Sequence, residues 1–405
     1  MKAKLTCITP VAIGGGLPPL SPYTDYILQE DHMMILDQRA FASALHYNLS
    51  AYQQYKASLL NTDANNRIDF DLNTFINAKF NSSTKDSIIK TEIPQFGFEK
   101  GEKIEVNDIA RSVGRPYIPG SSIKGALKTA LLFEDLIQND FDNLKPFISK
   151  IELIYLRVAA ILQHLKQERF SSEPNKIRIK QLGKDLSNIV KPEIIDYFIS
   201  RYEETTFGSD FRSQFLYNQL RISDSNTLNS NEIVGVKLVR VSLVKNEQNI
   251  PIGSLAIASG SQLECDIAII PQFNKRDSIL LDGNIHELIQ RVNTHITNVL
   301  ACESDILNDS KLSEFNKAAY DAWFDKYESL LAIIDEENTM LIRIGSGKSI
   351  FYQTALPAVR LYNGEAFNKL RLMLDLGDTT IDNFPCTITL INNSYNSLGY
   401  LKIKI

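Results

Sequence analysis

The chain has 405 residues, 44% of them hydrophobic and 22% charged, with a formal net charge of -5 at pH 7. That length and apolar content are enough to bury one large core or two modest ones. Proteins that bind nucleic acid on their own are usually basic, so the charge balance argues against RNA binding, and any such surface here would have to be a local cluster of Lys and Arg.

The cysteines and the apolar runs argue against several other protein classes. Cys7, Cys265, Cys302 and Cys386 are scattered with no CxxC spacing, which disfavours a zinc knuckle and suits a reducing compartment. No charged-then-apolar leader opens the sequence, and charges interrupt the apolar runs, so we expect neither a signal peptide nor a membrane span. We therefore predict a cytoplasmic protein, and the sequence indicates no metal or cofactor.

The first quarter of the chain predicts short strands and loops. Residues 2–8 predict a strand, and the glycines Gly14–Gly16 with the prolines after them predict a loop. A short strand is expected over 33–36. Residues 60–90 are polar, rich in Asn, Asp and Ser and weakly periodic, so we expect a mobile or irregular segment there.

Helical periodicity dominates from about 121 to 205. Ser121 and Ser122 can cap a helix, and apolar residues recur at helical spacing over 151–165 and 194–202. The elements expected afterwards are strands over 236–244 and 263–269, helices over 288–299 and 315–334, and strands over 339–344, 386–391 and 401–405. Strands, then helices, then mixed elements are typical of an α+β fold.

The strongest local signal is the segment RPYIPGSSIKGALK, Arg115–Lys128. Its Pro-Gly pair predicts a tight turn, and a serine-led helix follows directly. The first turn of a helix offers unpaired amides and a partial positive charge, which is a natural seat for phosphate. Lys124 and Lys128 are four residues apart and lie on one helix face, with Arg111 upstream. An ordinary capped helix with solvated lysines explains the same pattern.

Two glycine-rich segments accompany this turn. The run Gly14–Gly16 lets another backbone approach closely, although a plain flexible turn also explains it. The segment RIGSGKS, Arg343–Ser349, is close to a phosphate-binding P-loop, but Ile342 stands where that motif needs a glycine. Gly345, Gly347 and Lys348 still predict a strand-end loop able to hold a phosphate. A glycine turn with one exposed lysine is the alternative.

Catalytic patterns are weak. The five histidines show no HxxxH or HExxH spacing, and no GxSxG elbow occurs. His32, beside Asp31, is in principle a general base for RNA cleavage, but a solitary solvent-facing histidine is far more often inert.

Basic residues gather over 166–191. Lys176, Arg178 and Lys180 alternate with two isoleucines and are expected on one side of an extended segment. Such a patch binds phosphates without reading sequence. Because acidic residues dilute the charge, an ordinary solvated face is the alternative interpretation.

The stretch IPGSSIKG at 118–125 resembles the hallmark segment of RAMP proteins, CRISPR-associated RNA-binding subunits with ferredoxin-like cores. Within the RAMPs, the length and the block order are most similar to the type III-A Csm subunits that cap the guide 3′ end. In the late glycine loop, Ser346 stands where a bulkier residue is common. The further blocks that agree in order and spacing are 5–16 with Asp25-Tyr26, 207–209 with 221–225, and 344–348 with Thr354.

The resemblance implies a ferredoxin-like (RRM-type) core with a helical insertion and a second strand-rich half. The expected halves are 1–205, with the helical block at about 121–205, and 206–405, with a hairpin at about 236–270 and the glycine-rich loop. The hairpin would cross the guide–target duplex.

The implied function is a non-catalytic crRNA-binding subunit that caps the 3′ end of a Csm complex and supports crRNA maturation and target RNA binding. Its implied partners are crRNA, target RNA, the backbone RAMP subunit and other Csm subunits. A RAMP endoribonuclease that processes precursor crRNA is the alternative, and a nucleotide-binding protein with a degenerate P-loop is a third possibility. The expected RNA contacts are Gly14, Gly15, Gly16, Arg111, Arg115, Gly120, Ser121, Ser122, Lys124, Lys128, Gly345, Gly347 and Lys348.

Overall fold

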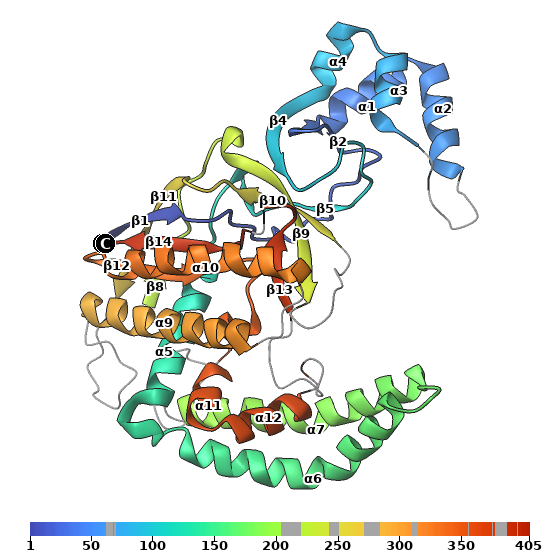
Figure 1. Cartoon of the computed structure of the whole chain (residues 1–405). Coiled ribbons are helices and arrows are strands. Elements are labelled where there is room, and N and C mark those ends of the chain that lie inside the picture. Colours follow the sequence, from blue (N-terminus) through green and yellow to red (C-terminus); the bar gives the residue numbers. More distant parts are fainter. Residues whose placement is uncertain are drawn as a thin grey trace.

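The computed structural model describes residues 1–61, 68, 70–203, 220–242, 251–270, 284–309, 314–354, 356–374, 376, 387–394 and 396–405. In these residues, two large β-sheets occupy the centre of the molecule, and two helical units lie at opposite ends (Figure 1). The predicted α+β class is confirmed. The block at 207–209 lies outside the described residues.

The first sheet and its helices form a ferredoxin-like unit. They comprise β1 (Lys2–Cys7), α5 (Gly120–Phe141), β8 (Leu220–Ile222), β11 (Gln262–Ile269), α9 (Ile285–Asp309), β12 (Thr339–Arg343) and β14 (Tyr400–Lys404). The strands lie in the order β12-β14-β1-β11-β8, and neighbours are antiparallel. Without the added edge strand β12, this is the βαββαβ arrangement of the RRM-type core implied by the resemblance.

Alternating burial along β1 explains how the first sheet is covered. Leu5 and Cys7 are buried while Lys4 is exposed, because successive side chains of a strand point to opposite faces. On the buried face, Leu5 belongs to one apolar cluster with Ile123 and Leu127 of α5. The helix α5 is therefore anchored on the sheet, and its first turn is held at a defined place.

The second sheet combines strands from distant parts of the chain. They are β2 (Tyr26–Leu28), β3 (His32–Leu36), β4 (Ile89–Phe96), β5 (Val106–Asn107), β9 (Ile233–Ser242), β10 (Ile252–Ile257) and β13 (Thr387–Ile391). β4 pairs with β9, and β5 pairs with β10, while β1 of the first sheet pairs with β11 and β14. Strands from the two expected halves therefore share both sheets.

The hairpin expected at about 236–270 is shorter than predicted. β9 and β10 pair antiparallel in the second sheet, but β11 belongs to the first sheet. The chain turns between the sheets at Gly260, which has a φ of +85° and donates its amide to the Cys7 carbonyl at 2.7 Å. An alternating strand pattern does not show which sheet a strand joins. The prediction from sequence therefore placed β11 in the same hairpin as β9 and β10. The segment 243–250 lies outside the described residues.

The prediction of an irregular segment over 60–90 was wrong for its second half. That half forms α3 and α4, and the N-terminal helical unit consists of α1 (Gln38–His46), α2 (Leu49–Leu60), α3 (Leu72–Lys79) and α4 (Ser82–Ile88). Asp71 accepts from the Thr74 amide at 2.8 Å, and Asn81 accepts from the Thr84 amide at 2.9 Å. The polar residues that suggested disorder are helix N-caps. Phe75 packs in the unit's own apolar cluster.

The helical block expected over about 121–205 consists of α5 and two longer helices. The second helical unit comprises α6 (Lys145–Arg169), α7 (Lys176–Glu203), α11 (Leu356–Tyr362) and α12 (Gly364–Met373), whereas α10 (Glu314–Ile334) packs against β12 and α9 of the ferredoxin-like unit. Lys176, Arg178 and Lys180 lie in the first turns of α7, so they do not line one side of an extended segment. Asn175 explains the difference, because its side chain accepts from the Arg178 amide at 3.1 Å and starts a helix.

Short elements complete the fold. A separate two-stranded ribbon pairs β6 (Arg111–Ser112) with β7 (Arg115–Pro116), and two 3₁₀ turns occupy Ser230–Glu232 and Ile350–Tyr352. In the described part of the chain, no helix combines the length and apolar character needed to cross a membrane.

Candidate functional site

The two glycine-rich segments meet at one end of the first sheet. The Ser346 amide donates to the Ala12 carbonyl oxygen at 2.7 Å. A Cβ on Gly345 would lie 2.2 Å from that same oxygen, and Gly345 has a φ of +76°. Glycine is therefore required at 345, because a side chain would collide with the segment that follows β1.

The glycine run is paired with the segment that leads to the hallmark turn. The Ala110 amide donates to the Ile13 carbonyl at 2.8 Å, and Gly14 forms an isolated β-bridge with Ile109. A Cβ on Gly15 would lie 2.9 Å from the Ile109 oxygen, whereas one on Gly14 would meet nothing within 4 Å. The close approach at Gly15 is thus to the protein's own backbone, and Gly14 remains open to a ligand.

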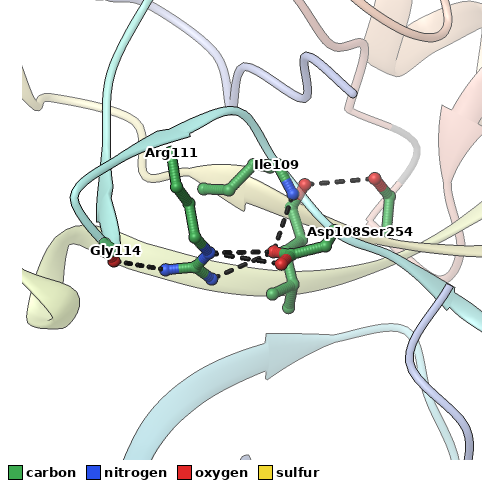
Figure 2. Close-up of polar contacts among 6 residues, drawn as sticks. Asp108, Ile109, Arg111, Gly114 and Ser254 are labelled. Atoms are coloured by element: carbon green, nitrogen blue, oxygen red, sulfur yellow. Dashed lines mark hydrogen bonds and ion pairs between the residues drawn. The ribbon is translucent and has the colours of Figure 1, made fainter. Parts of the chain in front are cut away.

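Arg111, which was expected to contact RNA, instead binds Asp108 and Gly114 of its own chain. Figure 2 shows its guanidinium turned toward Asp108, with Nε 3.2 Å from Oδ2 and Nη2 3.0 Å from Oδ1. Nη1 donates to the Gly114 carbonyl at 3.3 Å. A bidentate Arg–carboxylate pair is geometrically specific. Arg111 therefore holds the hairpin closed, and an RNA phosphate would have to compete with Asp108 for it.

The hallmark turn docks on the segment that follows β8. The Ile118 amide donates to Ser225 Oγ at 2.9 Å, and the Ser225 amide donates to the Ile118 carbonyl at 3.0 Å. The Gly120 amide donates to Asp224 Oδ1 at 2.8 Å. A Cβ on Gly120 would lie 2.5 Å from the Ser223 carbonyl oxygen, so only glycine fits there. Two of the blocks that carry the family resemblance are therefore in direct contact.

The start of α5 differs from the prediction of a serine cap. The helix begins at Gly120, which places Ser121 and Ser122 inside its first turn. The Ser122 amide donates to the Pro119 carbonyl at 2.9 Å, and the anion at the helix end is the Asp224 carboxylate. A cap supplied from more than a hundred residues away leaves no local pattern. The Gly120 amide thus has a carboxylate partner within the chain.

Basic side chains gather beside this helix end. Burial, with the nearby cations Arg221 and Lys128, lowers the pKa of the Lys124 ammonium. Both cations therefore lie close enough to Lys124 to repel its charge, and an anionic ligand at Lys124 would relieve that repulsion. We call Lys124, Lys128 and Arg221 the basic cluster. Sequence reasoning missed Arg221, because only the packing of β8 against α5 brings it to the lysines.

A buried arginine fixes the late glycine loop. Arg343 donates from Nε to the Leu398 carbonyl at 2.9 Å and from Nη2 to the Gly347 carbonyl at 3.1 Å. Its guanidinium lies over the rings of Tyr352 and Tyr400, 4.8 Å from each centroid. The loop conformation is therefore set by a buried side chain and does not depend on a bound ligand.

Glu303 of α9 ties the same loop to the helical layer. Its carboxylate accepts from Ser349 Oγ at 2.8 Å and from the Tyr352 hydroxyl at 2.9 Å, and Oε1 lies 3.8 Å from Arg343 Nη1. The segment after the loop is the 3₁₀ turn Ile350–Tyr352, whereas a P-loop leads into an α-helix. The loop is therefore not followed by the α-helix whose first turn binds phosphate in a P-loop, and this disfavours the nucleotide-binding alternative.

Lys348 is half-buried, and burial, then the nearby Arg343, lower its pKa. It lies at the end of the same loop, next to the Gly347 carbonyl held by Arg343.

His32 lies apart from these loops, at the start of β3 in the second sheet. Its Nδ1 is 2.6 Å from Asp31 Oδ1, and this hydrogen bond lowers the pKa of Asp31. Among the described residues, no group of three or more metal-ligating side chains is present. His295 is only 5% exposed, and this burial lowers its pKa to about 3.

Comparisons with known proteins agree with this architecture. The family model described as the RAMP superfamily matches residues 4–352. The CRISPR system Cms protein Csm5 of Methanocaldococcus jannaschii is 23% identical over 426 residues, covering 100% of this chain and 89% of that protein.

Two solved structures share the fold. A chain of a type III-A Csm-crRNA-target RNA ternary complex matches with a TM-score of 0.66 and 18% identity, covering 100% of both chains. T. onnurineus Csm5 matches with a TM-score of 0.60 and 18% identity, covering 98% of this chain and 99% of that one.

Proposed function

The chain belongs to the RAMP superfamily, and from that premise we propose that it is the crRNA-binding subunit that caps the guide 3′ end in a type III-A CRISPR Csm complex. One observation carries the proposal: the segment around Gly14 is hydrogen-bonded both to the late glycine loop, through Ser346, and to the segment that leads into the hallmark turn, through Ala110. The names of the Csm5 relative and of the ternary complex support the assignment to this complex.

The basic cluster is the proposed phosphate contact. Like charges gather at Lys124, Lys128 and Arg221 on an acidic protein. When an RNA backbone neutralises them, the counterions released from the RNA favour binding. The helix amide at Gly120 has a lesser role, because Asp224 already accepts from it. Gly14 and Gly16 offer open space in which an RNA backbone could approach.

The proposed partners follow from the same assignment. The subunit would pack against the last backbone RAMP subunit and other Csm subunits, support crRNA maturation and contact target RNA. The β9–β10 hairpin, which lies between β4 and β5 in the second sheet, is our candidate for the element that reaches the guide–target duplex.

We propose that the subunit is non-catalytic. His32, the histidine considered as a general base, forms its hydrogen bond with Asp31 at the start of β3 in the second sheet and not among the glycine-rich loops. The arrangement beside the basic cluster offers binding groups, namely ammonium and guanidinium cations and glycine amides. These groups neutralise and position phosphates.

Guide retention in the assembled complex tests the proposal. Complexes carrying wild-type chain or the double variant Lys124→Glu/Lys128→Glu are purified, and co-purifying crRNA is quantified. We expect complexes with this variant to retain less crRNA than complexes with the wild-type chain. Lys56→Glu/Lys79→Glu, which changes one exposed and one half-buried lysine of the N-terminal helical unit, is the control matched to Lys128 and Lys124 in charge and burial. Equal retention by both double variants would refute the assignment.

A further inference from the structure

The hairpin before the hallmark turn has an unusual tip. β6 and β7 are joined by Val113 and Gly114, whose φ values are 50° and 78°. A two-residue turn with both φ values positive is the type I′ turn, which strongly favours Asn-Gly. In the described part of the chain, Val113 is the one β-branched residue with a positive φ, and its side chain is 101% exposed.

Both features are unfavourable in the isolated subunit. A β-branched side chain clashes with the backbone at positive φ, and an apolar side chain at a hairpin tip gains nothing from water. Asparagine would fill the same turn position with less strain. Strain of this kind persists where the surrounding structure holds it in place, and it concentrates at ligand-binding positions.

The surrounding structure does hold the tip. Arg111 anchors one strand through Asp108 and reaches the Gly114 carbonyl, and the Tyr117 amide donates to the Ala110 carbonyl at 3.3 Å. Arg115, beside the tip, is exposed, and within the described residues no ion pair engages it. The strand then runs directly into the turn that starts α5.

We propose that Val113 packs against a nucleobase of the bound guide while Arg115 binds the adjacent phosphate. This inference rests on the proposed function. A base face is apolar and lies within a chain of negative charge, which matches an apolar tip flanked by an exposed cation. An apolar pocket on a neighbouring subunit would match the valine but would leave the arginine unexplained.

Three substitutions separate the apolar contact from the backbone strain. Val113→Asn relieves the strain and removes the apolar surface, Val113→Thr keeps the branched shape but adds a hydroxyl, and Val113→Ile keeps both properties. The full-length variants are titrated with labelled poly-uridine RNA and with an abasic oligonucleotide of equal length. Their Tm values are measured in parallel.

We expect Val113→Asn and Val113→Thr to bind poly-uridine about tenfold more weakly than wild type, and Val113→Ile to bind like wild type. On the abasic strand all four proteins should bind equally. Only Val113→Asn should raise the Tm. Equal poly-uridine binding by wild type and Val113→Asn would overturn the inference. So would unchanged RNA binding combined with loss of a neighbouring subunit from the purified complex. If the wild-type protein does not bind RNA, the result contradicts the proposed RNA-binding function, and with it the role of Val113.

Discussion

The backbone amide of Gly120 donates a hydrogen bond to Asp224 Oδ1 across 2.8 Å, which joins the start of α5 to the segment after β8. A carboxylate at this position interacts favourably with the positive end of the helix dipole. It also places a negative charge where a phosphate would otherwise bind. The proposed anion binding at the hallmark turn would therefore depend on Lys124, Lys128 and Arg221.

Replacing Asp224 should separate stability from RNA affinity. In Asp224→Asn the carboxylate no longer faces the helix dipole, so we expect the free energy of unfolding to fall by about 1 kcal/mol. RNA affinity should rise, because a negative charge beside the basic cluster is removed. Urea denaturation and RNA titration measure the two quantities. Weaker RNA binding by this variant would contradict the role given to Asp224.

Gly345→Ala should disrupt the contact between the late loop and the segment after β1. The new Cβ would lie 2.2 Å from the Ala12 oxygen at a φ of +76°. We expect a loss of at least about 2 kcal/mol in the free energy of unfolding. Gly14→Ala is the matched control, since its Cβ would meet nothing within 4 Å. Similar stabilities for the two variants would show that the loops do not meet as described.

Alkaline pH should destabilise the protein through its buried phenols. Burial raises the pKa of Tyr400 from 10.0 to about 12 and also raises that of Tyr352. A raised folded-state pKa gives stability that is complete below the unfolded value near 10 and is lost as the pH rises toward 12. Unfolding monitored between these pH values should show this decline.

Tyr400→Phe is the control for the alkaline prediction. It removes one ionisation, so the decline should be shallower. Its stability at neutral pH should be lower by about 1 kcal/mol, because the hydrogen bond to the Tyr352 hydroxyl is lost. A decline of unchanged steepness would mean that Tyr400 is not protected from water.

The salt dependence of RNA binding should show how many phosphates the basic cluster neutralises. For single strands, the logarithm of the binding constant falls with the logarithm of the salt concentration by about 0.7 per phosphate neutralised. Lys124→Gln, Lys128→Gln and Arg221→Gln should each reduce the slope by about that amount, while Lys56→Gln should leave it unchanged. Identical slopes for Arg221→Gln and wild type would remove Arg221 from the cluster.

The endoribonuclease alternative makes a distinct prediction. Purified chain incubated with precursor crRNA should give no defined cleavage product, and His32→Ala should behave like wild type. Gel analysis of end-labelled RNA checks both. A discrete product that disappears in His32→Ala would establish the alternative in place of the binding role.

Local sequence patterns predicted the elements better than their contacts. The helix after the hallmark turn and the α+β class follow from periodicity, and the ferredoxin-like core follows from the family resemblance. The cap of that helix does not, because its donor and acceptor are Gly120 and Asp224, which are adjacent only in the folded chain. The same reason hides Arg221, which joins two lysines through the packing of a strand on a helix.

The prediction from sequence was wrong where polar residues form hydrogen bonds within the chain. The polar residues of 60–90, Asp71 and Asn81 among them, were counted as signs of an irregular segment, but both start a helix through a side-chain hydrogen bond. Asn175, which the sequence analysis did not single out, starts α7 in the same way. Arg111 was assigned to RNA because of its charge, yet a bidentate contact with Asp108 engages it. Charge and polarity in a sequence do not reveal whether the partner is solvent, ligand or the chain itself.

Crosslinking of the guide 3′ end tests the central claim most directly. A crRNA with a photoreactive uridine near its 3′ end is assembled into the complex, irradiated and digested, and the modified peptides are identified. Our account predicts crosslinks in this subunit within 12–16, 111–128 and 345–348. Crosslinks confined to other subunits, or to the outer helices α6 and α7, would contradict it.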